Sequence, residues 1–182
     1  MSARADVLFT GYARRDGVAG TIGLIRDGDH TIVVDPGMVP ARAVIFDALD
    51  SLGVRPDDVT DIVISHHHPD HTLNIALFPV VPVHDFWAVY HGDQWLDRPA
   101  DGAVVSPHVR LMATPGHTPE DITTLVDTTD GVVAFTHCWW YEGIEGDRRA
   151  ADLDELMVRR ARVAEVADLV VPGHGPAFEI SR

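Results

Sequence analysis

The stretch Ser65-His66-His67-His68-Pro69-Asp70-His71 decides the fold, and it begins at the last residue of the short apolar run 61–65. It contains His66-x-His68-x-Asp70-His71, a pattern of four potential metal ligands. Two imidazoles one residue apart, just beyond a strand, can converge on one ion, while Asp70 and His71 can reach a second. Neutral imidazole and carboxylate ligands suit Zn²⁺, Fe and Mn²⁺. The sequence therefore predicts a metal site at the end of this strand.

Two more histidines stand in glycine turns further along the chain. They belong to Thr114-Pro115-Gly116-His117-Thr118 and to Val171-Pro172-Gly173-His174-Gly175. Each turn follows an apolar run, and each contains a Pro-Gly pair that forces a sharp turn and lets the backbone approach closely. A single histidine in a loop is more often an exposed surface residue. Two copies of Pro-Gly-His, together with the first motif, favour a metal-ligand role for His117 and His174.

The pattern of apolar residues predicts strands and helices in alternation. A helix is expected over residues 41–52, with Gly53 at its C-terminal cap. A second helix is expected over residues 152–167, where Glu155 gives a capping-box pattern. Strands are expected over residues 21–26, 31–35, 61–65, 109–113, 123–126, 132–136 and 169–171. This order favours mixed sheets enclosed by helices.

The composition indicates an ordinary globular protein, with one domain over residues 1–182. Hydrophobic residues make up 46% of the chain and charged residues 23%. No apolar run approaches the ~18–20 residues that a membrane span requires, and no apolar stretch follows the N-terminus, so neither membrane association nor secretion is expected. The single cysteine, Cys138, cannot form an internal disulfide. A free thiol suits a reducing compartment, and a cytoplasmic location is predicted.

The charge of the chain disfavours polyanionic partners. The formal net charge is −14, and every basic residue is an arginine. A strongly negative field repels nucleic acid and anionic membranes. We therefore expect a small-molecule substrate and no nucleic-acid partner, while the oligomeric state stays open.

With its three histidine motifs, the sequence resembles the metallo-β-lactamase superfamily, and the likeness extends upstream to Asp35-Pro36-Gly37. The resemblance implies an α/β fold, a four-layer αβ/βα sandwich with its site at one end of two facing sheets. It implies two zinc ions, with Fe or Mn as alternatives. A hydroxide bridging the metals would be the nucleophile, and Asp70 would be the catalytic residue that orients it.

The resemblance also implies which residues hold each ion. The first metal would be held by three histidines, His66, His68 and His117. The second would be held by Asp70, His71 and His174.

The sequence departs from the family pattern at one position. After the strand that follows the third histidine, most family hydrolases have Gly-Asp, and this Asp bridges the metals. Here His137-Cys138 stands at that place. Cys138 is predicted to be the ligand of the second metal, as in the zinc β-lactamases that use a thiolate. The alternatives are His137 as the ligand, or Cys138 as a small buried hydrophobe with no metal bond.

Three residues outside the motifs are candidates for contact with substrate. His91 lies in a predicted loop that could overlook the site. Trp139 and Trp140 directly follow Cys138, so one of the pair could form a wall of the pocket, although the usual place of tryptophan is the core.

The function that these observations favour is metal-dependent hydrolysis of a small ester, thioester, lactone or amide. Four alternatives stay open: a β-lactamase, a metallo-nuclease, a mononuclear iron sulfur-dioxygenase, and a non-catalytic metal-binding scaffold. Cys138 favours the β-lactamase, whereas the acidic charge disfavours the nuclease because a phosphate backbone needs a basic track. The altered bridging position is the feature that favours the scaffold.

Overall fold

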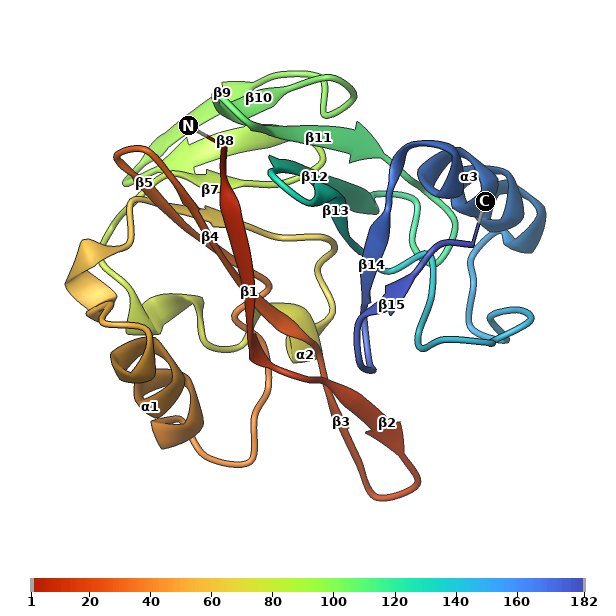
Figure 1. Cartoon of the computed structure of the whole chain (residues 1–182), viewed down its shortest axis with the longest axis horizontal. Helices are drawn as coiled ribbons and strands as arrows, with labels where there is room; N and C mark the ends of the chain where they lie inside the picture. The colour runs from red at the N-terminus through yellow and green to blue at the C-terminus, as the bar shows by residue number, and fades with distance from the viewer. Residues whose placement is uncertain (1, 182) are drawn as a thin grey trace.

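Two β-sheets packed face to face form the centre of the protein in its computed structural model, which describes residues 2–181 (Figure 1). The seven-stranded sheet has the order β1-β4-β5-β6-β7-β8-β9, and the six-stranded sheet has the order β10-β11-β12-β13-β14-β15. A separate ribbon of β2 and β3 projects from the body of the molecule. The first and last positions of the predicted domain, residues 1 and 182, lie outside the described residues.

The strands of the first sheet and its accompanying ribbon come almost entirely from the first half of the chain. They are β1 (Arg4–Phe9), β2 (Tyr12–Arg14), β3 (Gly17–Ala19), β4 (Ile22–Asp27), β5 (His30–Val34), β6 (Asp61–Val63), β7 (Val83–His84), β8 (Ala88–His91) and β9 (Gln94–Asp97). The second sheet contains β10 (Val104–Ser106), β11 (Val109–Ala113), β12 (Ile122–Thr128), β13 (Gly131–Thr136), β14 (Leu169–Pro172) and β15 (Phe178–Glu179). The helices are α1 (Ala43–Ser51), α2 (Pro69–Thr72) and α3 (Leu153–Val166), with short 3₁₀ turns at Pro56–Asp58 and Ile75–Leu77.

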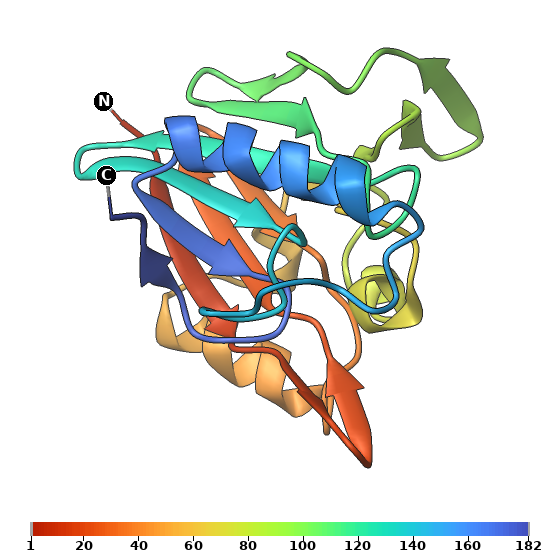
Figure 2. The same cartoon turned by 90° about the vertical axis from the view of Figure 1, so that its right-hand side faces the viewer.

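Three apolar clusters divide the molecule into four layers. The cluster between the sheets includes Ile32 and Val34 of β5 and Phe135 of β13. A second cluster packs α1 on the outer face of the first sheet, and a third packs α3 on the outer face of the second. Figure 2 shows α3 lying across the second sheet, with α1 on the far side of the molecule. This arrangement is the predicted four-layer αβ/βα sandwich.

Side-chain alternation along the central strands explains why each sheet can be covered on both faces. In β5, Val33 faces the α1 cluster, whereas Ile32 and Val34 face the opposite sheet. A strand with period two buries both of its faces where consecutive residues are apolar, as Ile32, Val33 and Val34 are here.

The predicted helices are present with shifted ends. The first covers Ala43–Ser51, and Gly53 follows its C-cap with φ of +69°, a left-handed conformation that glycine adopts without strain. The second covers Leu153–Val166, and the Asp152 carboxylate accepts a hydrogen bond from the Glu155 backbone N–H at 2.9 Å. All seven predicted strands are present with small differences at their ends.

Parallel pairing brings the ends of distant strands to one side of the sandwich. β5 runs parallel to β6, and β13 runs parallel to β14. Residues that directly follow these strands therefore meet at the same edge. Among the described residues, no helix is both long and apolar enough to cross a membrane.

Candidate metal centre

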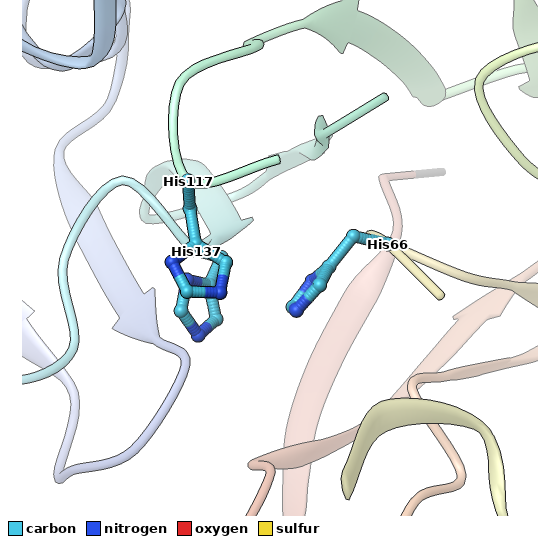
Figure 3. A group of neighbouring side chains, drawn as sticks. All are labelled: His66, His117 and His137. Carbon is cyan, nitrogen blue, oxygen red and sulfur yellow. The ribbon is translucent and has the colours of Figure 1, made fainter. Parts of the chain in front are cut away.

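The histidines of the three motifs all follow strand ends on this side of the sandwich. His66 and His68 follow β6, His117 follows β11, and His174 follows β14. Figure 3 shows His66 pointing across the gap toward His117 and His137, which come from the opposite sheet. The two facing sheets thus supply the two halves of one cluster.

The first group of donors consists of His66, His68 and His117. Nδ1 of His68 lies 3.0 Å from Nε2 of His66 and 3.1 Å from Nε2 of His117. Nitrogens bound to one tetrahedral zinc at about 2.0–2.1 Å lie about 3.4 Å apart. The three nitrogens are therefore close to the separation that a shared ion requires.

A second group lies beside the first. Nε2 of His71 and Nε2 of His174 are each 3.6 Å from the Asp70 carboxylate oxygen Oδ2. Nε2 of His137 is 3.1 Å from Nε2 of His174. In both groups the donor atoms face one another.

Buried carboxylates hold two of these rings from behind. Nδ1 of His71 donates to Asp35 at 2.8 Å, and Nδ1 of His117 donates to Asp147 at 2.6 Å. The Trp140 indole N–H also donates to Asp147, at 2.9 Å. Since Nδ1 carries the proton in this arrangement, Nε2 of each ring keeps a lone pair directed at the cluster.

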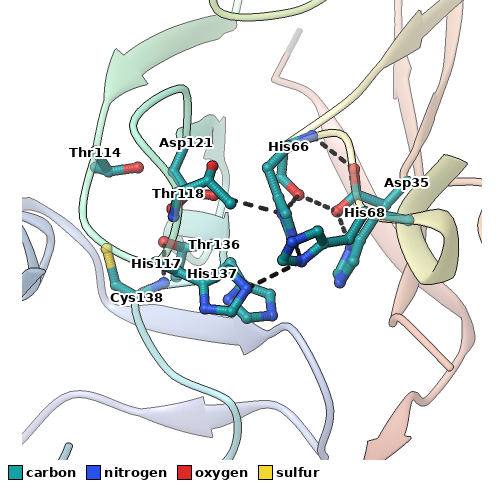
Figure 4. A network of polar contacts seen from close by, with 12 residues as sticks. Asp35, His66, His68, Thr114, His117, Thr118, Asp121, Thr136, His137 and Cys138 are labelled. Atoms are coloured by element: carbon teal, nitrogen blue, oxygen red, sulfur yellow. Dashed lines mark hydrogen bonds and ion pairs between the residues drawn. The ribbon is translucent and has the colours of Figure 1, made fainter. Parts of the chain in front are cut away.

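Two further rings have partners of the same kind. Nδ1 of His66 lies 3.4 Å from the buried carboxylate of Asp121 and 3.1 Å from the Ser65 hydroxyl. Nδ1 of His174 donates to the Ala19 carbonyl at 3.0 Å. Figure 4 shows Asp35 and Asp121 on opposite sides of the His66 ring. Outer partners of this type fix the tautomer and orientation of metal-binding histidines.

The electrostatics favour a neutral imidazole at His66, His137 and His174. Burial, reinforced by the neighbouring histidines, lowers the pKa of His66 and His137 well below the usual value and lowers that of His174 to about 4. Burial acts most strongly on His71 and would lower its pKa, but the hydrogen bond to Asp35 and the charges of Asp35, Asp70 and Asp121 together raise it. Burial also raises the pKa of Asp121 to about 7. Neutral rings have the free lone pairs that a metal needs.

The structure corrects the prediction for Cys138. Its side chain is 2% exposed and packs in the cluster beneath α3, and Figure 4 shows the sulfur on the side of Thr114, away from the imidazoles. Burial raises the pKa of the thiol to about 11. His137 lies among the imidazoles of the cluster, whereas its neighbour Cys138 packs beneath the helix. The Arg160 guanidinium donates to the Cys138 carbonyl at 2.7 and 2.9 Å, which holds the chain in this position.

Two glycines permit the close approach that the cluster requires. A Cβ on Gly37 would lie 1.7 Å from the Asp70 carbonyl oxygen. A Cβ on Gly173 would lie 2.4 Å from Cδ2 of His137. A side chain at either position would push a member of the cluster out of place.

A cavity of about 230 Å³ opens onto the donor groups. Its lining includes His68, Asp70, Trp140 and Arg149. A larger cavity of about 700 Å³ shares Trp140 and Arg149 with it. The two cavities therefore meet at Trp140, next to the cluster.

The three predicted substrate contacts lie in different places. Trp140 lines both cavities. Trp139 instead is buried beneath α3, where the Arg160 guanidinium lies 5.1 Å from its ring centroid, so the prediction for it is corrected. His91 is an exposed residue at the end of β8 and is absent from the lining of either cavity.

Sequence reasoning missed the carboxylates that hold the rings. The sequence places Asp35 at the end of a strand and in the family likeness but gives it no role at the site, yet it adopts a φ of +52° and accepts hydrogen bonds from the Ser65 backbone and hydroxyl at 2.6 Å each. A non-glycine residue in this conformation needs support from its surroundings. Asp121 and Asp147 lie in loops with no distinguishing motif, so no local signal identifies them.

The donor set fits a pair of metal ions. Buried polar atoms without a hydrogen-bond partner among the described residues include Nε2 of His71 and Nδ1 of His137. Two facing nitrogens can form a hydrogen bond only if one of them carries a proton. Rings whose Nδ1 carries the proton offer only lone pairs to one another, so their facing nitrogens cannot all form hydrogen bonds. His137 belongs to two triads of potential ligands, one with His66 and His117 and one with His71 and His174.

Comparison with known proteins agrees with this geometry. The family model described as "Metallo-beta-lactamase superfamily" matches residues 15–176. This chain belongs to the metallo-β-lactamase superfamily. It is 32% identical over 193 residues to metallo-beta-lactamase domain-containing protein 1 of Xenopus laevis, covering 96% of this chain and 80% of the relative. The Homo sapiens protein of the same name is 36% identical over 162 residues, and the match covers 83% of this chain and 60% of that protein.

Two hydrolases are also similar to this chain. A hydroxyacylglutathione hydrolase of Aeromonas salmonicida is 36% identical over 108 residues, covering 53% of this chain and 39% of the relative. The structure of a quorum-quenching N-acyl homoserine lactone lactonase matches with a TM-score of 0.68 and 19% identity, covering 95% of this chain and 91% of that one. The second likeness shows a shared fold.

Proposed function

We propose that this protein is a zinc-dependent hydrolase that cleaves a small ester, thioester, lactone or amide. The observation that carries the proposal is the set of imidazole nitrogens that face one another beside an open cavity. The similarity to a hydroxyacylglutathione hydrolase and the shared fold with a lactonase support carbonyl chemistry.

The proposed ligands are those of the two donor groups. His66, His68 and His117 would hold one ion, and Asp70, His71 and His174 would contribute to the other. A site rich in nitrogen donors, with a single carboxylate, suits zinc better than magnesium or calcium, which prefer oxygen ligands. The bound metals would supply Lewis acidity toward a carbonyl oxygen and lower the pKa of water.

The surrounding residues would position the substrate and move protons. Asp70 lines the cavity, where its carboxylate can accept a proton beside the reacting carbonyl. Trp140 is held by Asp147, so it offers a fixed apolar wall. Arg149 lines both cavities, and we expect an anionic group of the substrate to lie against its guanidinium.

The structure removes the support for one alternative, and the charge of the chain disfavours another. The Cys138 thiol was the feature that favoured a β-lactamase, and it lies in the core beneath α3. For a nuclease, the net charge of −14 stays unfavourable, and we expect no binding of RNA or DNA at physiological salt in a shift assay. An iron-dependent oxygenase and a non-catalytic scaffold would be distinguished by the metal analysis and activity assays below.

A panel of carbonyl substrates tests the proposal directly. Zinc-loaded protein is expected to hydrolyse at least one of an aryl ester, an acyl thioester, an acyl lactone and a β-lactam. The activity should disappear on chelation, return with zinc, and be absent from His117→Ala. Zinc-loaded protein that is inactive on every class would contradict the proposed function.

A further inference from the structure

Each of the two donor groups offers three ligands, but the kinds of ligand differ. The first contains three nitrogens, from His66, His68 and His117, joined by contacts of 3.0 and 3.1 Å. The second contains the Asp70 carboxylate and the Nε2 atoms of His71 and His174. The position of His137 decides which of the two groups gains a fourth protein ligand.

The donor atom of His137 faces His174 of the second group, although the centroid of its ring is 4.2 Å from that of His117 and 5.1 Å from that of His174. Its Nε2 is 3.1 Å from Nε2 of His174, the same separation as between donors of the first group. The His137 ring contacts Gly173, the residue before His174. A Cβ added to Gly173 would lie 2.4 Å from Cδ2 of His137, which is too close for a side chain to be present there. Because β13 and β14 run side by side and parallel, His137 and His174 leave the sheet together. The backbone therefore fixes this pair of rings.

A histidine at position 137 cannot bind two ions at once through neighbouring atoms, as a carboxylate at this position could. A carboxylate has two oxygens and can bind two ions, whereas one nitrogen of a neutral imidazole has one lone pair for one ion. Nδ1 of His137 is buried and has no hydrogen-bond partner among the described residues, unlike Nδ1 of His71 or His117. No carboxylate therefore raises the basicity of this ring.

We propose that His137 is the fourth ligand of the second metal, with Asp70, His71 and His174, and that the first metal keeps an open coordination position. Sites with four protein ligands are typically closed and structural, whereas sites with three keep a position for reactants. The two ions would then divide the work: the second stabilises the site, and the first acts on the substrate. The inference relies on the proposed function only for the presence of two metals.

Cobalt-substituted protein provides the test, because the visible spectrum of Co²⁺ reports its coordination. Chelated protein is loaded with two equivalents of Co²⁺ and titrated with azide, a small anion that occupies an open position. In the wild type, azide is expected to change the spectrum of one ion of the two. His137→Ala should bind the second ion more than about 100-fold more weakly, since even loss of an outer partner costs about 10–100-fold.

Two other variants keep the inference falsifiable if His137→Ala folds poorly. His137→Asp should keep both ions, and its shared carboxylate should couple them magnetically. Cys138→Ala is the matched control at the neighbouring position and should keep the wild-type affinities and the wild-type azide response.

Three results would overturn the inference: azide changing both wild-type ions equally, magnetic coupling of the wild-type ions through the His137 ring, or undiminished affinity of folded His137→Ala for both ions. Failure of the wild type to bind any cobalt or zinc would instead contradict the proposed function.

Discussion

Two clusters of histidine and aspartate in this protein use the same residue types in opposite ways. In the metal centre, imidazole nitrogens face one another at 3.0 and 3.1 Å. In the second cluster, His30 and His84 each face the Asp61 carboxylate, at 3.0 and 3.1 Å. An imidazole that faces a carboxylate is satisfied within the protein. Imidazoles that face one another need a further partner, such as a metal ion, to use their lone pairs. This difference distinguishes a binding site from a structural contact.

Removal of one imidazole ring from each cluster should give the largest difference in metal content and activity. His117→Ala is expected to lose metal and to reduce activity more than about 100-fold, because a ligand and its lone pair are gone. His84→Ala, in the cluster paired by Asp61, should keep its metal content and its activity. Metal analysis by mass spectrometry and the hydrolysis assay check both variants. Equal metal loss in the two variants would remove the distinction between the clusters.

Substitution of the carboxylates should give the next effect. Asp147→Asn removes the charge behind His117 while keeping the size of the side chain, so metal affinity should fall about 10–100-fold. Asp61→Asn should leave metal affinity unchanged and lower the melting temperature. Competition with a coloured chelator measures the affinity, and thermal unfolding measures the stability. Unchanged affinity in Asp147→Asn would show that the bond to His117 has no role in holding the ion.

The metal-free protein should lose stability to acid in two different pH ranges. His174 has a folded pKa of about 4, below the ordinary 6.5, so the unfolded chain binds more protons and stability falls as the pH drops from about 6.5 to about 4. His66, His68 and His137 shift in the same direction, while His71 opposes them.

Asp61 should affect the stability of the folded protein at lower pH than the histidines do. Burial would raise its pKa, but hydrogen bonds from His84 and His30 lower it to about 2, against an ordinary value of 3.8. Its contribution is therefore present above about pH 3.8 and is lost as the pH falls toward 2. Urea unfolding of chelated wild type and Asp61→Asn across pH 2–7 separates the ranges. A loss of stability that occurs only below pH 4 would contradict the lowered histidine pKa values.

The smallest effect is expected from Arg149. Its exposed guanidinium is screened by water, so Arg149→Ala should raise KM for an anionic substrate about five-fold and leave kcat and metal content nearly unchanged. The neighbouring Arg148→Ala, which lines only the larger cavity, serves as the matched control. Equal KM values for the two variants would remove Arg149 from substrate binding.

The sequence predicted the layers of the fold because the buried strands carry strong local signals. β5 ends in the apolar run Ile32-Val33-Val34, β13 contains the apolar run Val132–Phe135, and α3 begins with an aspartate cap. The β8–β9 hairpin could not be predicted in the same way, since all four residues of Gln94–Asp97 are exposed and no apolar pattern marks them. Its pairing depends on the neighbouring strand rather than on its own sequence.

The motifs predicted most of the converging donors but not the last one. His137 and Cys138 are adjacent, and the choice between them depends on which side of the chain faces the cluster after β13. A shift of one residue reverses that choice, and the likeness to the family's bridging position favoured Cys138. Asp147 lies 30 residues from His117 in the sequence, so only the folded chain brings them together.

Zinc titration of chelated protein, followed by native mass spectrometry and thermal unfolding, tests the central claim most directly. The protein is expected to take up two equivalents of zinc and to melt at a higher temperature as it does so. A ligand present at a thousand times its Kd stabilises the folded state by about 4 kcal/mol. Chelated protein that takes up no zinc, with an unchanged melting temperature and correct folding, would contradict the assignment of the facing histidines as a metal centre.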